Sequence, residues 1–129
     1  MDTPQPFSYN THLNILHPHL ELIDEKALAD ACTFQWYNQT LCQVNDSVIR
    51  MAVVQGEYHW HKHENEDEFF YVVEGHLSID VRDSDGERTI ELDPRQGVVM
   101  PRNTMHRPRA PQRTVMLMVE PATIVPTGS

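Results

Sequence analysis

The sequence has few cysteines and no long hydrophobic run, and these shortages exclude several classes of protein. Its two cysteines, Cys32 and Cys42, lack CxxC spacing, and we expect both to be reduced thiols in or near the core. No apolar run approaches the length of a membrane-spanning helix, which is about 18 residues. The N-terminal run MDTPQPFSYN has no basic stretch before an apolar segment, so we expect neither a secretory signal nor a transit peptide. A cytoplasmic location is the expectation that follows.

Basic residues are also scarce. Ten Lys and Arg stand against nineteen Asp and Glu, which gives a net charge of −9. Nucleic acid and anionic membrane surfaces would repel such a chain, so the composition argues against both as partners. Phosphate-binding loops, the glycine fingerprint of dinucleotide-binding folds and the GxSxG nucleophile motif are absent from the sequence as well.

What is present fits one globular domain. The chain has 129 residues, a usual length for a single domain, and its 40% hydrophobic content is too high for a disordered chain. Residues 1–12 are polar and contain proline, which predicts a flexible N-terminal arm, and we assign residues 13–129 to the domain. Residues 23–31 predict a short helix with Asp24 as its cap.

Most of the remaining chain has the pattern of β-strands. Leu77, Ile79 and Val81 alternate with polar neighbours, as in a strand with one apolar face, and Asn45-Asp46 predicts a hairpin turn. The predicted strands are 13–20, 39–44, 47–54, 56–63, 68–75, 76–83, 87–92, 97–100 and 114–121. Short strands that recur every 8–12 residues or so predict an all-β sandwich or barrel.

The chain contains eight histidines, and five of them lie between residues 59 and 106. His59, His61 and His63 are separated by one residue each, so on a strand all three imidazoles project from one face. Two such imidazoles can reach one metal ion, and Glu68 on the next strand can complete one side of its shell. Imidazole and carboxylate together suit Fe, Mn, Ni, Cu, Co or Zn, so these residues predict a site for one divalent transition metal.

The spacing of these residues resembles a known motif. The run from Gly56, GEYHWHKHENEDEFFYVVEG, contains His61-x-His63, then Glu68 after four residues and Gly75 after six more. It resembles the first motif of the cupin superfamily, HxH(x)3–4E(x)6G. The sequence around it, from Trp60 to Ile79, is also similar to small single-domain bacterial cupins described as mannose-6-phosphate-isomerase-like.

The second cupin motif, roughly G(x)5PxG(x)2H, is matched less fully by PRQGVVMPRNTMH. Pro101 and His106 keep their places, but Arg95 stands at the first glycine position and Asn103 at the second. Among residues with a side chain, Asn is well suited to a left-handed turn, so we expect this turn to survive and to place His106 as a ligand.

The resemblance implies a fold and an assembly. The expected fold is a jelly-roll β-barrel of two antiparallel sheets with the short helix near its N-terminus. Small cupins commonly pair through N-terminal strands, so we expect a homodimer in which residues 13–20 and 33–37 extend the partner's sheet.

The resemblance also implies a metal centre inside the barrel, held by His61, His63, Glu68 and His106. Three imidazoles and one carboxylate leave coordination positions open for water, O2 or a small-molecule substrate. Glu68 can then detach or accept a proton, and His59 is the nearest spare base, which makes these two the candidate catalytic residues. Alternatively, His59 is an ordinary polar residue at the barrel end.

Two classes of function follow from such a site. A metalloenzyme would use it for a dioxygenase reaction or for isomerisation of a carbonyl compound such as a sugar. A sensor or storage module would bind metal or a small ligand without chemistry, and we favour the enzyme. Around the metal we expect an apolar cup of Phe70 and Val72, with Tyr58 pointing away. Candidate anchors for an anionic substrate, or else surface residues, are Arg50, Arg102 and Arg107.

Overall fold

The computed structural model describes residues 8–129, and these residues form eight strands and one short helix. In chain order the elements are β1 (Tyr9–His12), α1 (Glu25–Ala31), β2 (Trp36–Val44), β3 (Ser47–Glu57), β4 (Glu68–Glu74), β5 (Leu77–Asp83), β6 (Gly86–Leu92), β7 (Gly97–Met100) and β8 (Met105–Pro121). The prediction of a mostly β protein with a short helix near its N-terminus is confirmed. Within residues 8–129 no helix has the length and hydrophobicity needed to cross a bilayer.

Helix α1 begins where the sequence predicts its cap. The Asp24 carboxylate accepts a hydrogen bond of 3.0 Å from the Ala27 N–H, which satisfies one of the free donors of the first turn. The helix ends at Cys32, whose extended backbone donates its N–H to the Ala29 carbonyl. Ala29 is buried against side chains of the neighbouring sheet, namely Leu41, Met51, Val53 and Val115.

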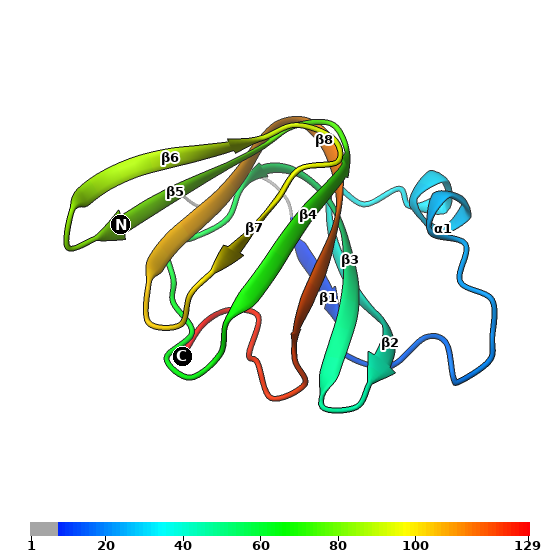
Figure 1. The fold of residues 1–129 in the computed structure, drawn as a ribbon. Coiled ribbons are helices and arrows are strands. Elements are labelled where there is room, and N and C mark those ends of the chain that lie inside the picture. Colours follow the sequence, from blue (N-terminus) through cyan, green and yellow to red (C-terminus); the bar gives the residue numbers. More distant parts are fainter. Residues whose placement is uncertain (1–7) are drawn as a thin grey trace.

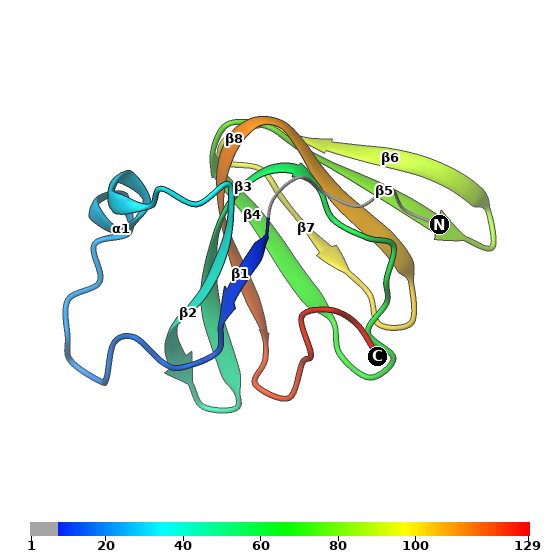
Figure 2. The same ribbon diagram turned by 180° about the vertical axis from the view of Figure 1, so that it is seen from behind.

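The long strand β8 joins the two layers of the barrel (Figures 1 and 2). The larger layer has the strand order β1-β2-β3-β8-β4-β7, and the smaller layer is made by β6, β5 and the first part of β8. Residues 105–109 of β8 pair with β5, whereas residues 114–121 pair with β3, so one strand serves both layers. Strand β1 pairs with β2 in parallel, and the other pairings are antiparallel.

The barrel interior is filled by alternate residues of the strands. Val54, Val72, Leu77 and Ile79 are fully buried and belong to one cluster, which lies between the two layers. Removing this apolar surface from water is the main force that holds the layers together. The cluster ends where the polar residues Glu68, His61 and His106 begin, so one end of the interior is apolar and the other carries the histidines.

Four segments differ from the sequence predictions. Residues 9–12, assigned to the flexible arm, form β1, while residues 1–7 of that arm lie outside the described residues. Residues 13–20 form bends and turns, not an edge strand, because Pro18 cannot donate to a ladder and, among these residues, only Leu16 and His17 make backbone-to-backbone bonds to β2. The homodimer predicted through this segment stays a prediction.

The strand predicted over 56–63 is also wrong. Strand β3 ends at Glu57, after a bulge between Val54 and Gly56 where Gly56 takes a φ of 116°. The chain then leaves the ladder, and His61 keeps only an isolated bridge to His106. Strand β8, in contrast, begins at Met105, earlier than predicted, because residues 105–109 pair with β5 although Pro108 has no N–H to donate. The Pro108 carbonyl accepts the Tyr58 N–H at 3.0 Å.

Candidate metal centre

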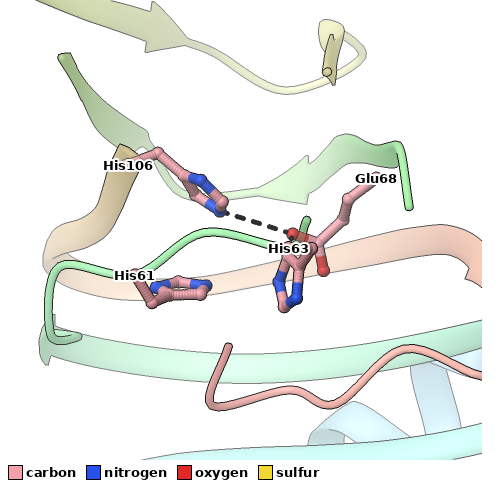
Figure 3. A group of neighbouring side chains, drawn as sticks. All are labelled: His61, His63, Glu68 and His106. Atoms are coloured by element: carbon pink, nitrogen blue, oxygen red, sulfur yellow. Dashed lines mark ion pairs between the residues drawn. The ribbon is translucent and has the colours of Figure 1, made fainter. Parts of the chain in front are cut away.

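Four buried side chains from separate segments meet at one end of the barrel (Figure 3). His61 and His63 lie in the irregular segment after β3, Glu68 begins β4, and His106 lies near the start of β8. One ligand atom from each residue lies within 4.8 Å of the others. The structure therefore brings together the four residues that the two sequence motifs single out, in a group able to bind a metal.

Backbone hydrogen bonds fix the two histidines that face each other. His61 and His106 exchange main-chain bonds of 3.0 and 2.9 Å, which hold the segment of His61 against β8. The Nδ1–H of His61 donates to the His59 carbonyl at 3.0 Å, and that of His106 donates to the Thr104 carbonyl at 2.8 Å. Each ring thus keeps its proton on Nδ1 and presents the lone pair of Nε2, as ligating histidines commonly do.

Three atoms at the centre of the group have no hydrogen-bond partner among the described residues. The Nε2 atoms of His63 and His106 lie 3.7 and 3.6 Å from Oε1 of Glu68, and all three atoms are buried. Burying polar atoms without partners is costly, commonly by about 1–3 kcal/mol for each group. A divalent cation would satisfy all three atoms at once, and imidazole with carboxylate is a donor set that transition metals accept. The residues present therefore fit a metal ion.

The protonation states also suit a cation. Burial first, and the adjacent His106 second, lower the pKa of His61 to about 3 and that of His63 to about 4. Burial lowers the pKa of His106 as well. All three imidazoles are therefore neutral near pH 7, which is the form that binds metal. Burial raises the pKa of Glu68, because its carboxylate has lost water without gaining sufficient positive charge.

A second buried carboxyl group supports Glu68 from behind. Glu120 lies beside it, and burial, followed by the contact with Glu68, raises the pKa of Glu120 to about 10. Its Oε1 accepts a bond of 3.3 Å from Arg50, and both side chains of this pair are 1% exposed. Glu120 was not predicted from the sequence, and Arg50 was expected to be a substrate anchor or a surface residue. Strand alternation was the available signal, since Arg50 shares a face with Ala52, and Glu120 with Met118.

A small cavity opens beside the metal ligands. His61 and Glu68 contribute to its wall, and the rest is mostly apolar. The other lining residues include Trp36, Asn38, Tyr58, Phe70, Met116 and Met118. The predicted cup is present in part, since Phe70 lies here with its ring centroid 6.2 Å from that of His106. Tyr58 was expected to point away, but it lines the cavity because the strand that would have turned it outward ends at Glu57.

The C-terminal segment 122–129 covers this end of the barrel, beside the loop that carries His61 and His63 (Figures 1 and 2). His59 does not join the four ligands; its Nε2–H donates to the Thr127 carbonyl at 2.9 Å. The Ser129 N–H donates to the Lys62 carbonyl at 2.8 Å. Gly128 lies so close that a Cβ there would be 2.9 Å from Cβ of His61. The catalytic role of His59 stays a prediction.

The two departures from the second cupin motif keep the backbone that the glycines would have adopted. Arg95 has a φ of 70° and Asn103 a φ of 60°, both in the left-handed region. The Asn103 N–H donates to the His63 carbonyl at 2.7 Å, which ties this turn to the ligand segment. The expectation that Asn103 preserves the turn is confirmed.

The other two arginines named as candidate anchors lie away from the cavity wall. Arg107 stands on the outer side of β8, where its Nη2 donates to Asp80 at 2.9 Å and its guanidinium lies over the Trp60 ring. Arg102 is exposed, and its N–H donates to the Asp67 carboxylate at 2.8 Å.

Comparison with known proteins agrees with this geometry. The family described as Cupin domain matches residues 48–120, a span that includes all four ligands. The uncharacterized protein YdbB of Bacillus subtilis (strain 168) is 40% identical over 94 residues, which cover 73% of this chain and 80% of that protein.

Solved structures share the fold. A cupin-2 domain containing protein from Shewanella frigidimarina has a TM-score of 0.71 at 29% identity, over 78% of this chain and 94% of that one. A single-residue variant of oxalate decarboxylase from Bacillus subtilis has a TM-score of 0.56 at 16% identity, over 63% of this chain and 22% of that one. The second likeness shows the fold alone.

Proposed function

This chain belongs to the Cupin domain family, and we propose on that basis that it is a metal-dependent enzyme acting on a small molecule. The observation that carries the proposal is the set of three buried atoms without partners, on His63, Glu68 and His106. A structural metal site is closed by protein ligands, whereas a catalytic site keeps a position open. Here a cavity reaches His61 and Glu68, which supports an open position on that side.

The ligands would be His61, His63, Glu68 and His106. When bound, a divalent transition metal supplies Lewis-acid chemistry and, for a redox-active ion, electron transfer. The protein would contribute the rest. The carbonyls of His59 and Thr104 hold the His61 and His106 rings in place, so the site is organised before the metal arrives.

Glu68 would also handle a proton during turnover. Its carboxyl group is buried, its pKa is raised, and the protonated Glu120 lies next to it, so a proton at this position can be shared between two oxygens. Tyr58 and Phe70 would exclude water from the substrate on the cavity side. Both a dioxygenase-type oxidation and a carbonyl isomerisation are compatible with this arrangement.

The test begins with metal content. Untagged protein should contain about one transition-metal ion per chain by elemental analysis, consistent with one four-residue site. His61→Ala and His106→Ala should abolish this content, while the exposed His19→Ala serves as a matched control and should retain it. Unchanged metal content in the two ligand variants would show that the ligand assignment is wrong.

Turnover is measured on protein reconstituted with each metal in turn. A panel of small metabolites is assayed for O2 uptake and, by proton exchange in D2O, for isomerisation. Substrate-dependent activity that disappears in His106→Ala supports the enzyme. Full metal occupancy with a tightly bound ligand and no turnover would instead identify a binding module of the sensor or storage type.

A further inference from the structure

Away from the metal ligands His61 and Glu68, most of the cavity wall is apolar. Trp36 and Tyr58 stack with their ring centroids 5.3 Å apart and their planes 14° apart, and they form one aromatic surface. Ala52, Phe70, Met116 and Met118 complete the wall from β3, β4 and β8, and each is at most 3% exposed. A ligand in this space exchanges water for carbon and sulfur contacts, so an apolar body gains most by entering it.

Positive charge is missing from the same wall. Among the described residues that line the cavity, none is Lys or Arg. Arg50 lies nearby but donates to Glu120 and does not reach the lining, and Arg109 is bound to Asp80 on the outer side of β8. The proposed divalent metal and the Glu68 carboxylate together leave one positive charge, which lies at the metal. A charged group elsewhere on a ligand would enter the cavity without a cation from the chain to balance it, which costs free energy in a buried site.

The polar atoms of the wall are committed, with one exception. His61 and Glu68 belong to the metal ligands, and the Tyr58 hydroxyl donates to the Pro126 carbonyl at 3.4 Å. Burial raises the pKa of Tyr58 to about 12, so its hydroxyl is neutral. The exception is Asn38, whose Oδ1 is buried and has no hydrogen-bond partner among the described residues. A buried amide oxygen without a partner is an acceptor that the hydroxyl or amide N–H of a ligand would satisfy.

We propose that the substrate of this cavity is a small molecule with an uncharged, apolar, preferably aromatic, body away from the metal, one oxygen for the metal and one polar group for Asn38. This inference rests on the proposed function, since it assigns the ligand of the same site. It sets aside sugar phosphates and other substrates with a charged group away from the metal, because no Lys or Arg lines the described cavity. Asn38 is thereby a specificity-determining residue, which binds the substrate without taking part in metal ligation.

The test uses Co(II)-loaded protein and probes of nearly equal size. 2-Hydroxyacetophenone is uncharged and carries a phenyl ring beside a hydroxymethyl ketone, whereas dihydroxyacetone phosphate has the same hydroxymethyl ketone with a phosphate group in place of the ring. Affinity is measured by the change in the visible Co(II) spectrum and by quenching of tryptophan fluorescence. We expect 2-hydroxyacetophenone to bind more tightly than dihydroxyacetone phosphate, by at least about tenfold for a buried unpaired charge. Tighter binding of dihydroxyacetone phosphate would overturn the proposal.

Asn38→Leu tests the specificity residue. This substitution should lower the affinity for 2-hydroxyacetophenone by up to about tenfold, because one hydrogen bond is lost. The affinity for acetophenone, which lacks the hydroxyl, should be unchanged. The variant should melt no lower than the wild type, because it removes a polar atom that has no partner among the described residues. Equal loss for both ketones, or no loss for either, would contradict the role of Asn38.

Failure of the metal site and failure of the ligand class give different results. If Co(II) does not bind, the proposed function is wrong, and tryptophan fluorescence of the metal-free protein still measures whether the cavity prefers the neutral probe. If Co(II) binds in the wild type and not in His106→Ala, but dihydroxyacetone phosphate is preferred, only the inference on substrate class is wrong.

Discussion

The Nε2 atom of His106 lies 3.6 Å from Oε1 of Glu68, and neither atom has a hydrogen-bond partner within residues 8–129. This pair is held from both sides, by the Thr104 carbonyl behind the imidazole and by Glu120 beside the carboxyl group. An arrangement that leaves the two facing atoms unsatisfied is unfavourable by itself and becomes favourable with a cation between the groups.

Glu68→Gln should therefore change the metal-free and metal-loaded proteins in opposite directions. Without metal it removes a buried ionisable group with a raised pKa, so the midpoint of thermal unfolding should stay constant or rise. Metal at a concentration of about 100 times its Kd should raise the free energy of unfolding of the wild type by about 2.7 kcal/mol. In the variant most of this increase should be absent. Scanning calorimetry with and without Co(II) measures both effects. A full metal-induced gain in the variant would exclude Glu68 as a ligand.

Asp80 should stabilise the protein above its unfolded-state pKa. Its carboxylate accepts hydrogen bonds from Arg109, Thr89 and Arg107, and the Arg109 bond is the first cause that holds its pKa well below the ordinary 3.8. Asp80→Asn should cost about 1.5–3 kcal/mol at pH 7, the range for hydrogen bonds to charged groups. A depressed pKa gives stability that is present above pH 3.8 and lost as the pH falls toward the folded value.

Urea unfolding of wild type and Asp80→Asn at pH 7, 4 and 3 checks this prediction. The difference between them should shrink at the lowest pH. Asp85→Asn, at the exposed β5–β6 turn, is the matched control and should show little effect at any pH. A constant difference across the series would mean that the Asp80 charge is not what stabilises the fold.

The contribution of His76 to stability should depend on pH in the opposite direction from that of Asp80. Its Nδ1 lies 2.8 Å from Asp93 and its Nε2 3.1 Å from Glu91, and these two hydrogen bonds, Asp93 first, raise its pKa above 6.5. A raised pKa gives stability that is present below pH 6.5 and lost as the pH rises through the folded value. The melting temperature of the wild type should thus exceed that of His76→Gln by more at pH 6 than at pH 9. An advantage that grows with pH would refute this assignment.

Gly128 offers a test of the segment that covers the site. Gly128 and Gly86 share a φ of 106°, so an alanine at either position carries similar backbone strain. Only at position 128 would the new Cβ meet other atoms, 2.9 Å from Cβ of His61 and 3.0 Å from the Lys62 carbonyl. Gly128→Ala should displace segment 122–129 and let a chelator remove the metal faster, while Gly86→Ala should not. Stopped-flow release of Co(II) to EDTA measures the rate, and equal rates would show that the segment does not limit access.

Local patterns were sufficient for much of the fold and for the choice of ligands. Asp24 caps α1 as predicted, because capping depends on residues only three positions apart. His61, His63 and Glu68 are near in sequence, and the spacing of Pro101 and His106 singled out the remaining ligand. All of these depend on short-range geometry, which the sequence displays directly.

Contacts between distant segments were beyond sequence patterns. The burial of Arg50 depends on Glu120, which is 70 residues away, and no local pattern links the two. The first part of β8 contains Pro108 and Pro111, and prolines in a sequence argue against a strand. Only the position of β5, with which this part of β8 pairs, shows that a strand can form here. The inward orientation of Tyr58 could not be predicted for the same reason, because β3 ends after a bulge in its pairing with the distant strand β8.

The segment over the cavity is held mainly through its main chain. Tyr58 and His59 donate to the carbonyls of Pro126 and Thr127, and the N–H of Ser129 donates to Lys62. Carbonyl groups are common to every residue type, so side chains at 126 and 127 can be exchanged without removing these anchors. Pro126 contributes to the wall that a ligand meets. Positions 126 and 127 can therefore be mutated to change the ligand preference of the cavity, while the metal ligands and the strands of the barrel stay unchanged.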